Sequence, residues 1–141
     1  MHLVYGYDRE VAAFVAGLMP NFGPDDVFRG VHALGIVSQD GHLVGGFVLQ
    51  PRAPWEGEIS VGFTTPRALT KNIIRDALRY AMVDLGFVRL VSRTELGNKR
   101  ARRLTLGMGF RETHKGKRAW DGARPAIFFE LTIDDCPWIE V

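Results

Sequence analysis

The segment at residues 58–94 constrains the fold more than any other part of the chain. Glu58–Phe63 has the alternating pattern of a strand, residues 64–69 break that pattern, and the period from residue 70 is helical. The helical part carries one apolar stripe, made of Ile73, Ile74, Ala77, Leu78, Ala81, Met82 and Leu85. Val88–Thr94 then forms a second strand. A strand–helix–strand crossover of this kind places its two strands parallel, with a right-handed connection.

Strands and helices alternate along the rest of the chain as well. Asp8 and Asn98 are expected to be helix N-caps, and Asp40-Gly41 predicts a two-residue hairpin turn. Residues 21–30 predict a loop. Further strands are expected at 2–7, 33–39, 42–50, 110–115 and 126–132, and further helices at 8–19 and 98–107. This order predicts a mixed α/β sheet flanked by helices.

Length and composition limit the possible classes of protein. A chain of 141 residues, 46% of them hydrophobic, predicts one globular domain over 1–141. No apolar run approaches the roughly 18 residues that cross a bilayer, and the N-terminal segment does not resemble a secretory signal. One cysteine, Cys136, and four scattered histidines predict neither a disulfide framework nor a metal site. We therefore expect a cytoplasmic protein that does not engage a membrane.

The step from Phe63 to Asn72 carries the main chemical signal. A strand here enters a short polar loop that opens an amphipathic helix, and the first amides of a helix bind phosphate groups well. Arg67 and Lys71 would add positive charge, and Thr70 would add a hydroxyl. An ordinary strand–helix connection capped by Thr70 is the other interpretation. Neither the triphosphate-binding loop nor the dinucleotide fingerprint is present.

Residues 94–110, TELGNKRARRLTLGMGF, carry a more specific pattern. They have the form N-x-x-A-x-x-L-x-x-x-x-G-F, given by Asn98, Ala101, Leu104, Gly109 and Phe110. Together with EISVGF at 58–63 and the ending from Asp121 to Trp138, this pattern resembles the GNAT superfamily of N-acyltransferases. The chain is similar to small phage and bacterial members of the branch that acetylates ribosomal proteins and amino acids. The resemblance implies an α+β fold with a mostly antiparallel sheet, a splayed parallel strand pair and flanking helices.

The resemblance also implies a cofactor and its site. Acetyl-CoA would be the co-substrate, with its pantetheine arm between strands 58–63 and 88–94 and paired to the backbone of Val61 and Phe63. A backbone amide near Val61–Gly62 would meet the thioester carbonyl. The pyrophosphate and the rest of the cofactor would be held by Arg67, Ala68, Leu69, Thr70, Lys71, Asn72, Asn98, Arg100 and Arg103. An amine acceptor, on a small molecule or a protein, would attack the thioester directly.

Two carboxylates are candidates for the catalytic base of such a reaction. Glu58 on the first strand could accept the ammonium proton through water, and Glu95, at the end of the second strand, is the other candidate. The family's usual loop glycines are replaced here, and Thr105 stands where many members have an acidic tyrosine. Trp55 and Trp120 fall in loops that border the acceptor groove in this fold.

Two other functions stay open at this point. One is a catalytically degenerate protein that binds acyl-CoA or serves as an interaction module. The other is a nucleic-acid-modifying or nucleic-acid-binding protein that uses residues 99–118, which carry eight basic side chains and one acid. The edge strands near the C-terminus make a homodimer possible.

Overall fold

The computed structural model describes residues 1–19 and 30–139, so that most of the expected loop at 21–30 lies outside the described residues. Seven strands form one sheet in the order β1-β2-β3-β4-β5-β7-β6. They are β1 (His2–Val4), β2 (His32–Val37), β3 (Leu43–Ala53), β4 (Glu56–Phe63), β5 (Arg89–Glu95), β6 (Arg111–Gly116) and β7 (Ala126–Thr132). Only β4 and β5 pair in parallel. The predicted mixed sheet with one parallel pair is confirmed.

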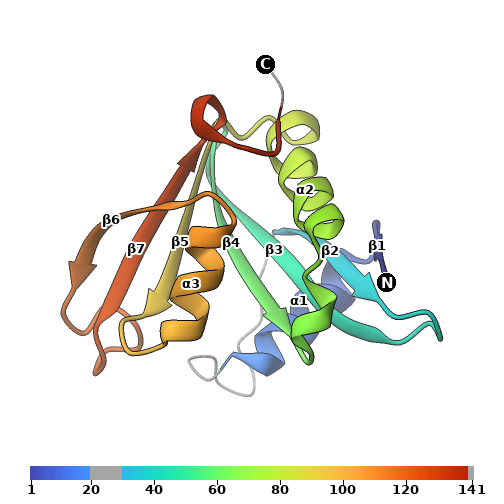
Figure 1. Cartoon of the computed structure of the whole chain (residues 1–141), viewed down its shortest axis with the longest axis horizontal. Coiled ribbons are helices and arrows are strands. Elements are labelled where there is room, and N and C mark those ends of the chain that lie inside the picture. The colour runs from blue at the N-terminus through green and yellow to red at the C-terminus, as the bar shows by residue number, and fades with distance from the viewer. Residues whose placement is uncertain (20–29, 140–141) are drawn as a thin grey trace.

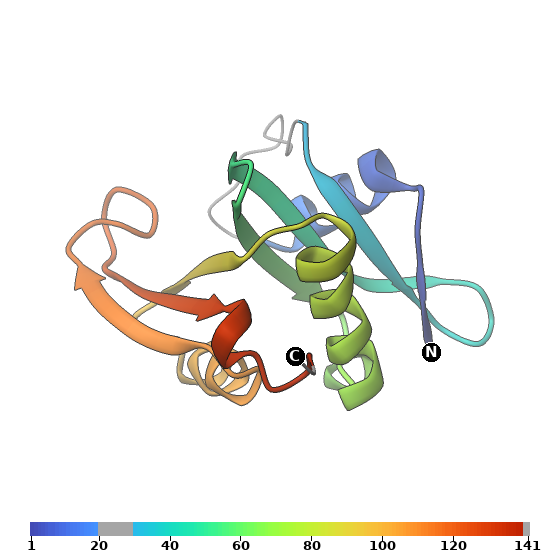
Figure 2. The same cartoon turned by 90° about the horizontal axis from the view of Figure 1, so that it is seen from above.

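Helices cover both faces of the sheet (Figures 1 and 2). Helix α1 (Asp8–Leu18) packs against β2, β3 and β4 on one face, while α2 (Lys71–Arg79) and α3 (Lys99–Gly107) lie on the other. The larger core lies under α2 and α3 and includes Phe47, Leu78 and Phe129. Within residues 1–19 and 30–139, no helix has both the length and the apolar character to span a bilayer.

Helix α1 packs closely on the sheet because glycines lie below it. A Cβ atom built on Gly46 would come within 2.7 Å of Val11 Cγ1, and one on Gly35 within 3.0 Å of Val11 Cγ2. A Cβ on Gly62 would meet Val15 at 3.3 Å and Leu18 at 3.4 Å. Side chains at these positions would push α1 away from the sheet, so the glycines allow α1 to pack closely. Gly62 in particular allows the end of α1 to lie beside β4.

Two of the predicted local features are wrong in detail. Asp8 is not the N-cap of α1: Tyr7 occupies that position, and the Asp8 carboxylate instead accepts the Ala33 amide at 3.2 Å. The turn between β2 and β3 is also longer than predicted: the Ser38 amide donates to the His42 carbonyl at 2.9 Å, which leaves three residues, 39–41, in the loop rather than two. In the described loop only Gly41 has a positive φ, +87°. A two-residue type I′ turn needs two such residues, whereas a three-residue loop needs one.

The connections around β4 and α2 also differ from expectation. β3 runs to Ala53 and β4 starts at Glu56, so the turn between them is shorter than predicted. The helix expected to run on to residue 85 changes after Arg79 to a π-helical turn at Tyr80–Asp84. Gly86 follows with φ +79°, the left-handed conformation that glycine commonly adopts just after a helix.

Replacing Gly46 with alanine tests the close packing of α1 on the sheet. The new methyl group would press on Val11 and on the Leu34 carbonyl, at 2.7 and 3.1 Å, so we expect the free energy of unfolding to fall by about 1–3 kcal/mol. Gly17→Ala, on α1 itself, is the matched control because a Cβ there meets nothing within 4 Å. That change should raise stability by about 0.5–1 kcal/mol. Urea denaturation measures both, and equal effects of the two substitutions would contradict the close packing.

Candidate functional site

The parallel pair β4–β5 is closed over only three residues of each strand. Glu56, Gly57 and Glu58 pair with Arg89, Leu90 and Val91, and the two strands then separate (Figure 1). Their outer edges stay paired beyond this point. β4 follows β3 as far as Phe63, and β5 follows β7 as far as Glu95. The sheet therefore opens between two strands that are each held firmly from outside.

The backbone of β4 presents alternate amides to this opening. The Thr64 amide donates to the Val44 carbonyl of β3 at 2.8 Å, which fixes the direction of Thr64. Successive residues of a strand point their N–H and C=O groups to opposite sides. Val61 and Phe63 thus direct their amides into the gap, whereas the Gly62 amide faces β3. A ligand in the gap would find backbone donors at Val61 and Phe63.

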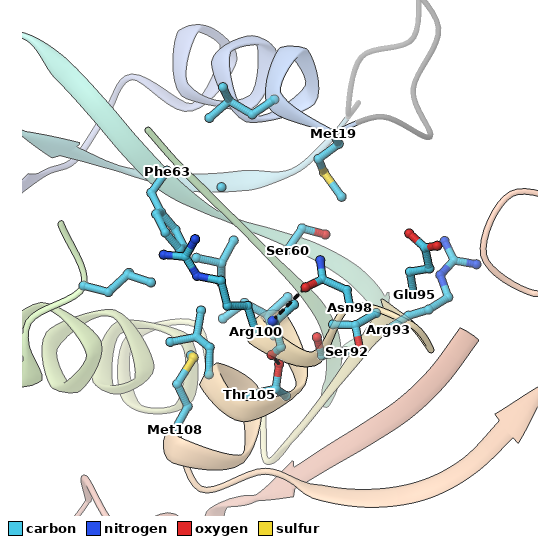
Figure 3. Close-up of a pocket in the computed structure, with 18 of the residues that line it drawn as sticks. Met19, Ser60, Phe63, Ser92, Arg93, Glu95, Asn98, Arg100, Thr105 and Met108 are labelled. Carbon is cyan, nitrogen blue, oxygen red and sulfur yellow. Dashed lines mark hydrogen bonds between the residues drawn. The ribbon is translucent and has the colours of Figure 1, made fainter. Parts of the chain in front are cut away.

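A cavity of about 570 Å³ fills the opening and continues between α3 and the end of α1. Its wall is mostly apolar along β4, mixed along α3 and polar along β5 (Figure 3). Such a volume suits a small organic ligand. The described lining includes Leu18, Met19, Ile59, Ser60, Val61, Gly62, Phe63, Thr64, Pro66, Leu69, Ser92, Arg93, Thr94, Glu95, Asn98, Arg100, Ala101, Leu104, Thr105, Met108, Phe110 and Trp120.

Helix α3 forms one wall of the cavity. Asn98 caps it as predicted, its side-chain oxygen accepting the Ala101 amide at 3.0 Å. Arg100 lines the cavity, and its guanidinium projects toward the side of Phe63 (Figure 3). The buried Thr105 hydroxyl donates to the Ala101 carbonyl at 2.8 Å. The Thr105 proton is therefore engaged within the helix.

The loop between β4 and α2 uses several of its own amides. A 3₁₀ turn at Pro66–Ala68 engages the amide of Arg67 with the Thr65 hydroxyl, and those of Ala68 and Leu69 with backbone carbonyls. The Thr70 hydroxyl caps α2 by accepting the Ile73 amide at 3.2 Å.

In the first turn of α2, the Lys71 and Asn72 amides have no acceptor within the helix. Of the predicted loop residues, Leu69 lines the cavity. Arg67, Ala68, Thr70, Lys71 and Asn72 lie outside the described lining, and Ala68 is fully buried.

The other end of the cavity is polar and charged. Arg93 and Glu95 project there from β5, away from Thr105 on α3 and from Met108 just after it (Figure 3). Trp120 lines the same cavity, whereas Trp55, the other predicted groove residue, is exposed at the β3–β4 turn. The Arg93 guanidinium donates to the Ala119 carbonyl at 3.2 Å. This bond ties the loop after β6 to β5.

A second ion-pair network fixes Glu95. Arg124 bonds to both Glu95 oxygens, at 3.2 and 3.3 Å, and to the Asp121 carboxylate at 2.8 Å. Asp121 also accepts the Arg124 and Ala123 amides. These amide bonds, and then the Arg124 side chain, lower the pKa of Asp121 to about 2. Glu95 is therefore held at the cavity by a loop that is itself closed by Asp121.

Glu58, the other predicted base, has a different environment. It lies at the last closed pair of β4 and β5, and its carboxylate forms an ion pair with Arg52 at 2.9 Å. It is not among the described residues that line the cavity. Of the two carboxylates, the structure brings Glu95 to the cavity wall.

Basic side chains of the segment 99–118 lie in different environments. Arg100 lines the cavity, Arg102 donates to the Leu96 carbonyl at 3.1 Å, and Arg111 bonds to Glu130. Arg103 is exposed and lies outside the described lining. No group of three or more His, Cys, Asp or Glu side chains suited to a metal ion occurs in the described ranges 1–19 and 30–139.

Sequence reasoning missed several lining residues. Ser60, Ser92 and Thr94 were not expected, and neither were Leu18 and Met19 at the end of α1. Consecutive residues of β4 and β5 line the cavity where the strands separate, so the alternation of the strands does not select them. The approach of α1 depends on the glycine contacts, which carry no local sequence signal.

No protein-family model matches the chain, and neither does any curated protein sequence. Solved structures do match. The spermidine N-acetyltransferase of Vibrio cholerae, in complex with CoA and spermine, has 15% identity and a TM-score of 0.73, over 95% of this chain and 96% of that one.

A protein of Acinetobacter baylyi ADP1, provisionally described as an acetyltransferase, has 16% identity and a TM-score of 0.73 over 99% and 95% of the two chains. A probable acetyltransferase has 21% identity and a TM-score of 0.62, over 75% of this chain and 64% of its own. The chain has the GNAT N-acetyltransferase fold. The resemblance drawn from the sequence is thus confirmed at the level of the fold.

The Asp121 carboxyl group offers a direct test of the loop that holds Glu95. Its folded pKa is lowered to about 2, so the stabilisation it gives is present above the unfolded pKa of about 3.9 and is lost as the pH falls through 2. Side-chain NMR titration should find its midpoint near 2. Arg124→Gln should raise the midpoint only part of the way, because amide bonds are the largest cause. A midpoint near the unfolded value in both proteins would show that the loop is open.

Proposed function

We propose that this chain is an acetyl-CoA-dependent N-acetyltransferase that moves an acetyl group to a primary amine by direct attack. The observation that carries the proposal is the early end of the β4–β5 pairing, with a cavity of about 570 Å³ in the gap. The GNAT fold supports it. An opening closed by side chains would have favoured a degenerate interaction protein.

The residues present fit acetyl-CoA, which would supply the activated acetyl group. The Phe63 amide is the backbone donor offered to a pantetheine carbonyl, and the Val61 amide is the candidate donor to the thioester oxygen. Lys71 and Asn72 offer the free amides of α2, and Arg100 adds a cation at the cavity. Asn98 holds the start of α3 beside that cation. Arg67, Ala68, Leu69 and Thr70 would shape the loop, since three of their amides are engaged within it, and Arg103 would act from outside the cavity.

Glu95 is the candidate base in this proposal. It lines the cavity, and Arg124 holds its carboxylate in place at 3.2 Å. From there it can accept the proton of an incoming ammonium group, directly or through water. Glu58 stays the alternative base.

The departing thiolate receives its proton from water in this scheme. The chain has three tyrosines, Tyr5, Tyr7 and Tyr80, and none of them lines the described cavity. The Thr105 hydroxyl donates a hydrogen bond to the Ala101 carbonyl and is a weak acid. Positioning in the gap and the Val61 amide must then supply most of the rate enhancement.

Blocking the gap should abolish acetyl-CoA binding. Ala101 lines the cavity, so an Ala101→Trp side chain would fill the space between α3 and β4. At a ligand concentration a hundredfold above Kd, the unchanged protein should gain about 2.7 kcal/mol of stability, seen as a rise of several degrees in Tm. Ala101→Trp should show no rise with acetyl-CoA.

Leu106→Trp is the matched control for this experiment. Leu106 lies on the same helix, is 52% exposed and is outside the described lining. This variant should keep the full rise in Tm. If both tryptophan variants bind acetyl-CoA as the unchanged protein does, the cofactor does not occupy the gap and the proposal fails.

The two carboxylates can be separated by turnover. Glu95→Gln should lower kcat with an accepted amine by roughly 10²–10⁴-fold, because the neutral amide cannot accept a proton. Glu58→Gln should leave kcat within about threefold, since Glu58 is paired with Arg52 away from the cavity. Thiol release by each variant at saturating acetyl-CoA measures both. A large loss of kcat in Glu58→Gln and a small one in Glu95→Gln would show that Glu58 is the base.

A further inference from the structure

We propose that the acceptor is a primary amine that also carries a carboxylate, and that Arg93 selects it. The inference rests on the proposed acetyl transfer and adds the substrate class. Amino acids are the simplest members of that class. The argument concerns the polar end of the cavity, where Arg93, Glu95 and Trp120 meet.

Arg93 is placed to bind an anion inside the cavity. Its side chain is half-buried and lines the cavity, and one guanidinium nitrogen is fixed on the Ala119 carbonyl at 3.2 Å. Among residues 1–19 and 30–139, no carboxylate lies within 4.0 Å of it. A guanidinium held by one neutral carbonyl keeps donors for a carboxylate, which it can bind through two bonds.

Trp120 adds an independent observation at the same place. Its indole nitrogen is buried and has no hydrogen-bond partner among the described residues. Trp120 follows Ala119, the residue to which Arg93 is bonded, and it lines the same cavity. An indole N–H can only donate. The buried indole donor has no partner, and the neighbouring guanidinium is bonded to one carbonyl. A ligand with acceptor oxygens would satisfy both groups.

Glu95 provides the negative group that would bind the ammonium of such an acceptor. It lies two residues after Arg93, so the two side chains leave the same face of β5 with their origins about 6.6 Å apart. An ammonium group at Glu95 would leave the carboxylate of the same molecule within reach of Arg93 and Trp120. The site thus offers one negative and one positive group, in the arrangement that a zwitterion needs.

A polyamine fits this end poorly. Glu95 is the single carboxylate in the described lining, so the site has no second negative group for a second ammonium. A second ammonium on the same acceptor would approach Arg93 and be repelled. The acceptor preference should therefore differ from that of a spermine-binding neighbour, although the fold is shared.

Matched pairs of acceptors test the inference. Each pair is an amino acid and the amine left when its carboxylate is removed: phenylalanine and phenethylamine, lysine and cadaverine, ornithine and putrescine. Thiol release from acetyl-CoA should give a kcat/KM at least tenfold higher for at least one acid than for its amine. Phenylalaninamide should behave as phenethylamine does, because it lacks the charge.

Substitution of Arg93 should remove the preference through KM. Arg93→Gln should raise KM for the preferred acid by about 10–100-fold and leave kcat/KM for the paired amine within threefold, so that the ratio falls toward one. Arg93→Lys should restore part of the preference, since it keeps the charge but not the planar fork. Arg79→Gln, on the exposed end of α2, removes a cation elsewhere and should leave the ratio unchanged.

The outcomes separate this inference from the proposed function. A Tm rise with acetyl-CoA together with equal or better turnover of the amines overturns the inference and leaves acetyl transfer standing. Binding of acetyl-CoA without turnover of any acid overturns it as well. Absence of both the Tm rise and thiol release contradicts the proposed function itself. A preference for the acid that survives in Arg93→Gln would assign the selection to another group.

Discussion

The backbone pairing between β4 and β5 stops after Glu58 and Val91. Every feature of the site depends on this early end of the pairing. A separated strand edge leaves donors and acceptors without partners, and a folded chain usually closes such an edge. Here it stays open because β3 and β7 hold the outer edges through Phe63 and Glu95. The unpaired inner edges line a cavity, and they are the groups that a ligand with amide groups can satisfy.

Packing on both faces keeps the strands apart. On one face, Gly62 lets Leu18 approach β4, so the end of α1 forms part of the cavity wall. On the other face, α3 fills the angle between the strands, and the C-terminal segment fixes its end. The Trp138 indole donates to the Met108 carbonyl at 2.8 Å. At Gly109, with φ +101°, a Cβ would come within 2.7 Å of Pro137. Closing the gap would require α3 and this segment to move together.

Local sequence patterns predicted the elements whose causes are local. The β7 bounds, Ala126–Thr132, follow from composition and alternation, and Asn98 and Gly86 mark helix ends by chemistry that acts within one turn. The π-helical turn at Tyr80–Asp84 has no such signal.

The polar end of the cavity was beyond prediction for a related reason. Arg93 was not singled out because its role depends on the loop that places Ala119 and Trp120 over β5, from 26 residues further along the chain. Glu95 could be named because it ends a strand beside the expected gap. The resemblance named the residues of β4 that line the gap, Val61, Gly62 and Phe63, but it did not name Arg93 on β5.

The division between these two sides also explains how one fold serves different acceptors. A cofactor bound as we propose, mainly through Val61, Phe63 and the start of α2, needs little from side-chain identity, so the loop can lack its usual glycines. The acceptor end has no such backbone template. Its chemistry is set by Arg93, Glu95 and the Arg124 network, and a change of one charge there alters which amine is stabilised without disturbing the sheet. Selection among acceptors can therefore vary while the opening in the sheet is retained.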